Sequence, residues 1–279
     1  MYDLKIKNSY GNTLDITWNP LFSVSEIDGL YPPDVALNLS NDIGTDGSVF
    51  NSAFLENRQI ILSIALNNPA SSGRHLLYQF FQQKKQLTLF FKNDISNLKI
   101  GCYIKNFTIT IFKKKETAQI TLICPKPLFD DVETIHQRLH VSQALLEFPV
   151  SFPVSGMEFS RGQASILTNM GDVESGFSGV IYADNSFSNP KIVNKTTGQF
   201  IGFDVTVNSG EKIEICTIDK QKYANKISAD GISTSIVSKM TSGSQWVKMI
   251  PGGNQMEMTA SSGNTFYLDV DFTAQYMGV

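Results

Sequence analysis

The stretch from Leu30 to Leu66 constrains the fold of this chain more than any other. It opens with Tyr31-Pro32-Pro33, and consecutive prolines impose an extended backbone and exclude a helix. A polar run from 38 to 52 follows, and Ile60 to Leu66 is then typical of a strand buried on both faces. A long polar run inside a compact domain is usually functional or disordered. It is either an arm that pairs with another chain or a mobile surface loop.

An arm of this kind satisfies its backbone hydrogen-bonding groups by adding strands to a neighbouring subunit. The residues predicted to form it are the two prolines at its start, its polar and glycine positions, and two aromatic side chains. These are Pro32, Pro33, Asn41, Asp42, Gly44, Asp46, Gly47, Phe50 and Phe54.

Size and composition predict two domains without a nucleic-acid site. The chain has 279 residues, which approaches the limit of a single hydrophobic core. We place the domains at 1–145 and 146–279, because prolines and mixed composition mark the passage between them. The formal net charge is −3 and the basic residues are dispersed, which argues against nucleic-acid binding. No apolar run has the length of a membrane span, and the N-terminus lacks the layout of a signal peptide. We therefore expect synthesis in a cytoplasm.

The first domain is predicted to be β-rich with one helix. Alternating apolar residues predict a hairpin over 4–18, with Trp18 on its apolar face. A helix begins near Ser71 and presents one apolar face. A second hairpin covers 100–124, and its tip is Lys113-Lys114-Lys115-Glu116. This charge run is either a solvated turn or an electrostatic dock for an acidic partner.

The second domain is predicted to be an all-β sandwich. Turn signals such as Thr197-Gly198, Ser209-Gly210 and Asp230-Gly231 recur every dozen residues or so. The runs between them are rich in β-branched and aromatic residues, which is typical of short strands. No helix of useful length is expected there.

No motif in the sequence indicates catalysis, a cofactor or a metal. There is no Gly-x-Ser-x-Gly elbow, P-loop or dinucleotide fingerprint. His136 and His140 could share a helical face, but no third metal ligand is placed by spacing. Asp269 and Asp271 lie too close in sequence for a glycosidase pair. Cys102, Cys124 and Cys216 fit neither a disulfide framework nor a zinc ribbon; Cys102 and Cys124 are expected as apolar fillers on neighbouring strands.

Aromatic side chains of the second domain leave one binding function open. An exposed ring can stack on the apolar face of a sugar. Tyr182, Tyr223 and Trp246 are the candidates for such stacking, although buried aromatic residues are commoner. The alternative function is thus a lectin-like module that binds cell-wall glycans through the second domain.

The order of short motifs along the chain resembles the distal tail proteins of siphophages, the long-tailed, non-contractile bacteriophages. In the first half, the resemblance rests on Asp28-Gly29-Leu30, Arg58 to Leu62, Arg74, and Cys124 to Phe129. In the second half, it rests on Gly171 to Glu174, Asn194 to Gly198, Ser209 to Ile213, Asp230-Gly231, and Trp246 to Asn254. Two departures are Cys216, where the family pattern has an acidic residue, and the lack of room for an additional carbohydrate-binding domain.

The resemblance implies a mainly β fold: an N-terminal domain with a belt and a helix, then a galectin-like β-sandwich. It implies a homo-hexamer that closes into a ring between the tail tube protein and the tail-tip protein of a virion. In some relatives the outer domains hold receptor-binding proteins. The polar arm lies where the belt of this family is expected. Neither catalysis nor a cofactor is implied.

Overall fold

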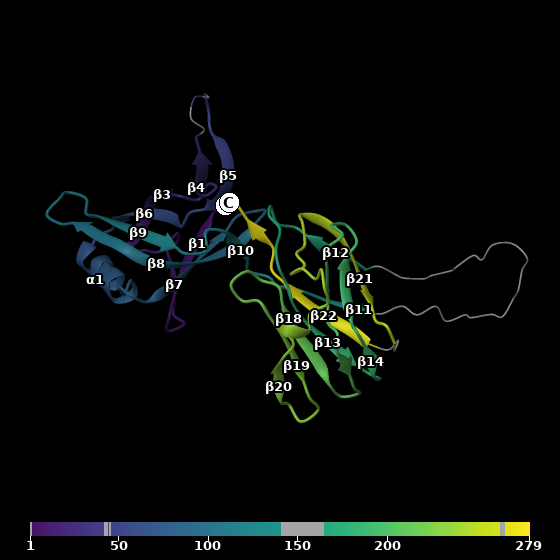
Figure 1. Cartoon of the computed structure of the whole chain (residues 1–279). Coiled ribbons are helices and arrows are strands. Elements are labelled where there is room, and N and C mark those ends of the chain that lie inside the picture. Colours follow the sequence, from purple (N-terminus) through teal and green to yellow (C-terminus); the bar gives the residue numbers. More distant parts are fainter. Residues whose placement is uncertain (1, 42–43, 45, 141–164, 263–265) are drawn as a thin grey trace, which may run out of the picture. The chain divides into compact units, whose positions relative to one another are not determined.

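The computed structural model describes residues 2–41, 44, 46–140, 165–262 and 266–279 (Figure 1). The chain forms two compact units. Unit 1 comprises Met1–Val132 and Gln275–Val279, and unit 2 comprises Glu133–Ala274. The domain boundary predicted at 145/146 lies outside the described residues. The last residues of the chain thus return to the unit formed by its N-terminal half.

Unit 1 is built mainly of antiparallel strands around one helix. Its elements are β1 (Asp3–Asn8), β2 (Thr13–Asp15), β3 (Phe22–Asp28), β4 (Val35–Ser40), β5 (Val49–Leu55), β6 (Arg58–Leu66), α1 (Ala70–Phe80), β7 (Gln86–Lys92), β8 (Asn97–Thr110), β9 (Thr117–Cys124), β10 (Phe129–Asp131) and β23 (Gln275–Tyr276). The main sheet has the order β2-β1-β7-β8-β9-β6-β3, and β10 joins it by pairing with β8. The chain end β23 pairs with β10.

The main sheet of unit 1 buries one face against α1. On β6, Ile60, Leu62 and Ile64 are fully buried, whereas the alternate side chains are half-buried. The expectation that this strand is buried on both faces was wrong, because an antiparallel sheet covered on one side leaves its other face to solvent. The helix contributes Leu77 and Phe80 to the same core.

The helix of unit 1 starts at Ala70, next to the predicted start near Ser71, whereas the position of Trp18 differs from the expectation. Trp18 is 59% exposed, because the β2 strand ends at Asp15 and the alternation does not continue to it. By contrast, the hairpin predicted over 100–124 is present as β8 and β9.

Unit 2 has the all-β structure predicted from its turn signals. Its elements are β11 (Ile135–His140), β12 (Ser165–Asn169), β13 (Ser178–Ala183), β14 (Phe187–Ser188), β15 (Lys191–Asn194), β16 (Phe200–Gly202), β17 (Thr206–Val207), β18 (Lys212–Cys216), β19 (Tyr223–Ile227), β20 (Ser233–Ser235), the 3-10 turn η1 (Val237–Lys239), β21 (Gly252–Thr259) and β22 (Phe266–Phe272). One sheet has the order β11-β22-β13-β18-β19-β20 and another the order β12-β21-β15-β16. The mainly β class predicted from the sequence is confirmed.

Buried asparagines hold the irregular segment before β21 in unit 2. Asn194 and Asn254 are fully buried. The Asn194 Nδ2 group donates to Lys248 O at 3.1 Å and to Asn254 Oδ1 at 3.0 Å. Asn254 in turn accepts from Ile250 N and donates to Ile250 O. A buried amide group is stable only when its donors and acceptors are paired, and these amides pair with a segment that has no ladder of its own.

Gly29 is the glycine whose replacement the backbone tolerates least. Its φ is +85°, and an added Cβ would lie 1.9 Å from the carbonyl oxygen of Gln59. Gly231 has a similar φ of +81°, but nothing lies within 4 Å of its Cβ position. We expect Gly231→Ala to lower the free energy of unfolding by about 1–2 kcal/mol, the usual cost of a left-handed backbone at a non-glycine residue.

Gly29→Ala is expected to lower the melting temperature much further, because it adds a clash with backbone to the same conformational cost. Thermal unfolding followed by circular dichroism compares the two variants directly. Equal melting temperatures would contradict the close approach of Gly29 to β6.

Candidate inter-subunit surface

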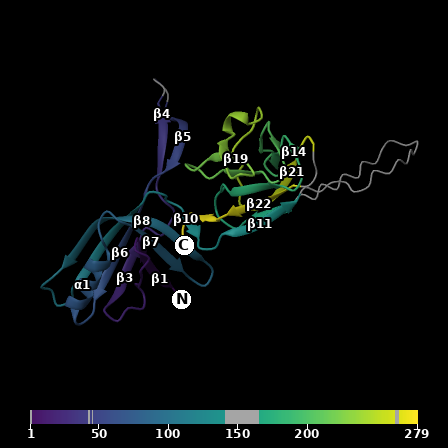
Figure 2. The ribbon, with the colours of Figure 1, turned by 90° about the horizontal axis from the view of Figure 1, so that it is seen from below.

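The strands β4 and β5 form a two-stranded sheet of their own. Among the described residues, neither strand pairs with the main sheet of unit 1, and the ribbon of this hairpin stands away from that sheet (Figures 1 and 2). We call residues Val35–Leu55 the arm. The predicted long polar loop is therefore a hairpin over most of its length. A two-stranded hairpin alone in water is marginally stable, so this one is suited to a partner surface.

One face of the arm is apolar and exposed. The register pairs Leu37 with Ala53 and Leu39 with Phe50, so these side chains share a face with Val35 and Leu55. The exposed fractions are 49% for Val35, 59% for Leu37, 50% for Leu39 and 61% for Phe50. The opposite face carries Asn38, Ser40 and Ser52 together with Ala36 and two exposed apolar side chains, Val49 and Phe54. Contiguous exposed apolar side chains of this kind mark interaction surfaces.

The predicted arm residues occupy different parts of this hairpin. Phe50 lies on the apolar face and Phe54 on the opposite face. Near the turn, the Asn41 side chain accepts from Ser48 Oγ at 2.6 Å, and Gly44 and Gly47 have positive φ. Asp46 is exposed, Pro32 and Pro33 lie at the root, and Asp42 lies outside the described residues. Val35, Leu37 and Leu39 were missed, although their strict alternation is the signal of a strand with one apolar face.

Arg58 ties the root of the arm to the rest of unit 1. Its side chain is 3% exposed. Nη1 donates to Gly29 O at 2.9 Å and to Tyr31 O, on the segment that leads into the arm. Nε donates to Pro127 O at 2.6 Å, and Nη2 donates to Met277 O at 2.6 Å. The guanidinium therefore joins the arm root, the end of β9 and the C-terminal segment.

The surroundings of Arg58 stabilise its charge without a carboxylate. Its partners in the described chain are carbonyl oxygens, and its guanidinium carbon lies 4.5 Å from the centre of the Phe129 ring. Burial lowers the pKa of Arg58 from its usual value, although arginine stays charged at any physiological pH. A buried guanidinium needs all of its donors paired, which is why it fixes several segments at once.

Three of the motifs on which the family resemblance rests meet at this guanidinium. Gly29 comes from the first motif, Arg58 from the second, and Pro127 from the Cys124–Phe129 motif. Their separation in sequence hid this convergence, because nothing in the local pattern shows that a carbonyl at 127 lies beside a side chain at 58. The motifs mark the base on which the arm is mounted.

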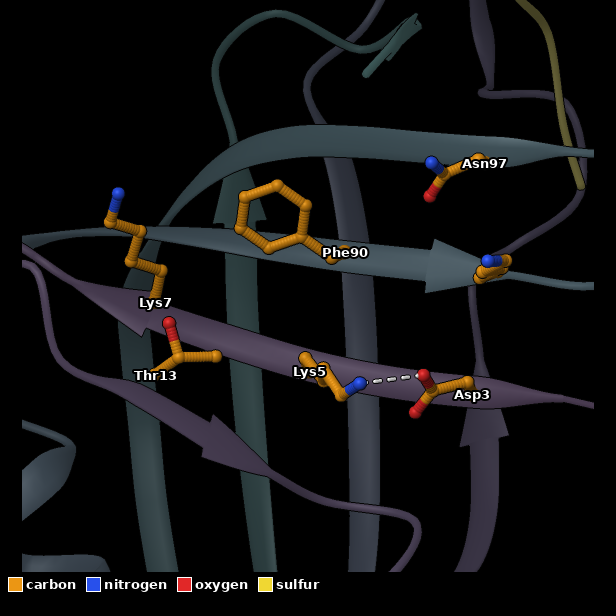
Figure 3. Close-up of a pocket in the computed structure, with 7 residues that line it drawn as sticks. Asp3, Lys5, Lys7, Thr13, Phe90 and Asn97 are labelled. Atoms are coloured by element: carbon orange, nitrogen blue, oxygen red, sulfur yellow. Dashed lines mark ion pairs between the residues drawn. The ribbon is translucent and has the colours of Figure 1, made fainter. Parts of the chain in front are cut away.

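A shallow hollow of about 410 Å³ lies on the polar face of the unit 1 sheet, outside the predicted site (Figure 3). It is lined by Asp3, Lys5, Lys7, Thr13, Phe90, Lys92 and Asn97. Lys5 Nζ forms an ion pair with Asp3 Oδ2 at 2.8 Å, which raises the pKa of Lys5 through hydrogen bonding and charge attraction. Lys7 and Lys92 are exposed, and Figure 3 shows the Lys7 side chain away from the ion pair of Lys5 and Asp3.

The residues considered for sugar stacking do not form one platform. Tyr182 on β13 stacks on Tyr267 of β22 with ring centroids 5.0 Å apart. Tyr223 lies on β19 of the same sheet, whereas Trp246 packs against the core of unit 2. Sugar binding by these residues stays a prediction.

The two histidines lie on a strand instead of a helix. The β11 strand pairs with β22, and His136 Nδ1 lies 2.6 Å from Asp271 Oδ1. Arg138 on the same strand forms a bidentate pair with Asp269. In the part of the chain that the structure describes, no cluster of histidine, cysteine and acidic side chains could hold a metal ion. No helix there has the length and hydropathy of a membrane span.

Comparison with known proteins finds a family similar to the second half of the chain. Residues 170–276 match the model of a family described as the siphovirus-type tail component, C-terminal domain. No curated protein matches the sequence of the chain.

The fold of the whole chain is similar to that of solved phage proteins. The crystal structure of the Dit protein (gp 19.1) of phage SPP1, described as a paradigm of the hub adsorption apparatus in phages that infect Gram-positive bacteria, matches with a TM-score of 0.65 over 98% of both chains at 12% identity. Chains of the phage P2 baseplate in its activated conformation with Ca and with Sr have TM-scores of 0.47, at 14% and 13% identity, and cover 97% and 98% of this chain and 98% and 99% of their own. The resemblance to distal tail proteins stated from the sequence is confirmed.

The role of Arg58 in unit 1 can be tested by a conservative substitution. Arg58→Lys keeps the charge but lacks the planar fork of donors, so several buried carbonyl groups lose their partner. We expect the free energy of unfolding to fall by about 2–4 kcal/mol, and proteolysis between 29 and 57 to accelerate.

Arg138→Lys is the matched control, because the Arg138 side chain is 51% exposed in its pair with Asp269. Exposed ion pairs contribute little to stability, so this variant should unfold almost as the parent does. Chemical denaturation and limited chymotrypsin digestion measure both effects, since chymotrypsin cleaves after aromatic residues such as Tyr31, Phe50 and Phe54. Similar losses in the two variants would contradict the special role of Arg58.

Proposed function

We propose that this chain is a structural protein of a phage tail tip. In this proposal identical copies form a hexameric ring through unit 1, and the ring joins the tail tube to the tail-tip proteins. Its outer surface is a docking platform for receptor-binding proteins. The family model that matches residues 170–276 and the fold shared with the SPP1 Dit protein support the assignment to the tail tip.

The observation that carries the ring is the exposed apolar face of the arm. Burying a leucine or phenylalanine side chain contributes about 1.5–3 kcal/mol, and the arm presents several that its own unit leaves in water. Both outer edges of this hairpin also have backbone groups available for strand addition, as judged from the described residues. A contact between the arm of one copy and another surface of the next is heterologous, and such contacts close into a ring when their rotation divides evenly into a circle.

The arm alone does not account for a permanent interface. Interfaces of that kind bury on the order of 2,000–5,000 Å² in total. The ring therefore needs the length of the arm together with sheet surface of the adjoining copy. We propose that the chain acts by this assembly, without catalysis, a cofactor or a nucleic-acid partner, and that it is made in the host cytoplasm and ends in the virion.

The ring has a direct test in the purified protein. Negative-stain images are expected to show hollow particles with six-fold symmetry. Particles of one copy at every protein concentration would contradict self-assembly through unit 1.

Two double substitutions in β4 separate the effect of losing the apolar face of the arm from the effect of adding negative charge. Leu37→Asp with Leu39→Asp places two carboxylates on the apolar face, whereas Asn38→Asp with Ser40→Asp places the same charge on the opposite face of the same strand. We expect the first pair to weaken association at least about 100-fold, since two buried leucines are lost from each contact. The second pair should assemble nearly as the parent chain does. Mass photometry across a dilution series gives both values, and equal weakening would contradict a role for the apolar face.

A further inference from the structure

The turn between β8 and β9 exposes apolar and cationic side chains together. Phe112 is 97% exposed and Ile111 is 48% exposed. Lys113, Lys114 and Lys115 follow and are also exposed. We call residues Ile111–Lys115 the knob. None of its lysines pairs with a carboxylate among the described residues, since the neighbouring Glu116 is held by Arg74 at 2.8 Å.

The backbone of the knob favours an external role for Phe112. Its φ is +64°, a left-handed conformation that is uncommon for a bulky side chain. No packing within unit 1 compensates for this conformation, because almost the whole side chain is in solvent. Residues held in such conformations occur preferentially where a surface binds something.

The arm has the complementary composition. Between 32 and 57 the chain contains no lysine, arginine or histidine, and its charged residues are Asp34, Asp42, Asp46 and Glu56. Three of these are described and exposed: Asp46 lies near the tip of the arm, and Asp34 and Glu56 lie directly outside it, at its root. The apolar face formed around Leu37, Leu39 and Phe50 accompanies this negative charge. An apolar, acidic hairpin thus matches an apolar, basic turn.

The arm and the knob lie at opposite ends of the same strands. The arm root adjoins the start of β6 at Arg58, which pairs with Cys124. The other end of that ladder is Ala65 opposite Thr117, and Thr117 pairs with Thr110 at the base of the knob. At roughly 3.3 Å per residue, these two ends are separated by about 23 Å. Figure 1 shows the arm and the β8–β9 turn leaving unit 1 at these opposite ends.

We propose that the knob is the surface that receives the arm of the next copy in the ring. In this contact Ile111 and Phe112 pack against the apolar face of the arm, and the lysines offset its carboxylates. A donor at one end of unit 1 and a receiver at the other make the contact head-to-tail, which is the geometry that a closed ring requires. The inference rests on the proposed ring and adds to it the receiving surface.

The decisive experiment is a charge exchange within one chain. Lys113→Glu with Lys115→Glu is expected to weaken ring formation at least tenfold in mass photometry at moderate salt. Adding Asp34→Lys and Asp46→Lys to the same chain should restore assembly, because the complementary signs are then exchanged. Lys7→Glu with Lys92→Glu is the control: it makes the same change in net charge at the hollow of Figure 3 and should leave assembly unchanged.

Each outcome decides between the two proposals. Normal rings in Lys113→Glu with Lys115→Glu would overturn the knob as receiver and leave the arm-based ring standing, provided that Leu37→Asp with Leu39→Asp still abolishes it. If rings are weakened and the added Asp34→Lys and Asp46→Lys changes do not restore them, the knob contacts another surface of the neighbouring copy. That result would overturn its pairing with the arm. Absence of rings in the parent chain would overturn the proposed function itself.

A cross-linking experiment tests the contact by proximity. The three natural cysteines are buried, so introduced surface cysteines report alone. After mild oxidation, the variant with Lys113→Cys and Asp46→Cys should give a ladder of covalent oligomers on a denaturing, non-reducing gel. The variant with Lys92→Cys and Asp46→Cys should give only the monomer band on the same gel. A ladder from both variants, or from neither, would overturn the proposed pairing.

Discussion

The arrangement of unit 1 depends on the buried guanidinium of Arg58. Its donors bind carbonyl oxygens of Gly29, Tyr31, Pro127 and Met277, which come from separate parts of the chain. A charge without a carboxylate is tolerated at this depth because carbonyl groups surround it and an aromatic ring covers it. The cost of leaving any of these groups unpaired makes the arrangement cooperative. Arg58 therefore sets the position from which the arm leaves unit 1.

The arm has an anchored root and exposed apolar side chains. A hairpin with exposed leucine and phenylalanine side chains gains little stability from its own strands, and a surface that covered those side chains would add to it. Arg58, the first residue of β6, anchors the root of this hairpin through the carbonyl groups of Gly29 and Tyr31. Such preorganisation reduces the entropy lost on association. The exposed turn between β8 and β9, at the far end of the same strands, is apolar and positively charged. In the proposed ring it complements the apolar, acidic surface of the arm.

Unit 2 uses a different means to reach a defined structure. Its strands are short, and buried asparagines replace ladder hydrogen bonds around the segment before β21. Asn194 and Asn254 both belong to motifs that carry the family resemblance, as Arg58 does in unit 1. These motifs are structural, because each supplies a polar group that satisfies buried backbone.

The mainly β class, the β8–β9 hairpin with its lysine tip and the all-β second half could be predicted from the sequence. Each follows from periodicity, turn residues or proline, which act over a few neighbouring residues. The hairpin form of the arm was hidden, since Val35, Leu37 and Leu39 alternate only briefly between prolines and a polar run. Three features could be seen only in the tertiary structure. The chain end returns to unit 1, and β11 belongs to unit 2. The Arg58 guanidinium binds carbonyl groups of segments that are distant in the sequence. Such pairings join residues far apart in the chain, and no local pattern specifies which distant partner a strand or a buried charge will find.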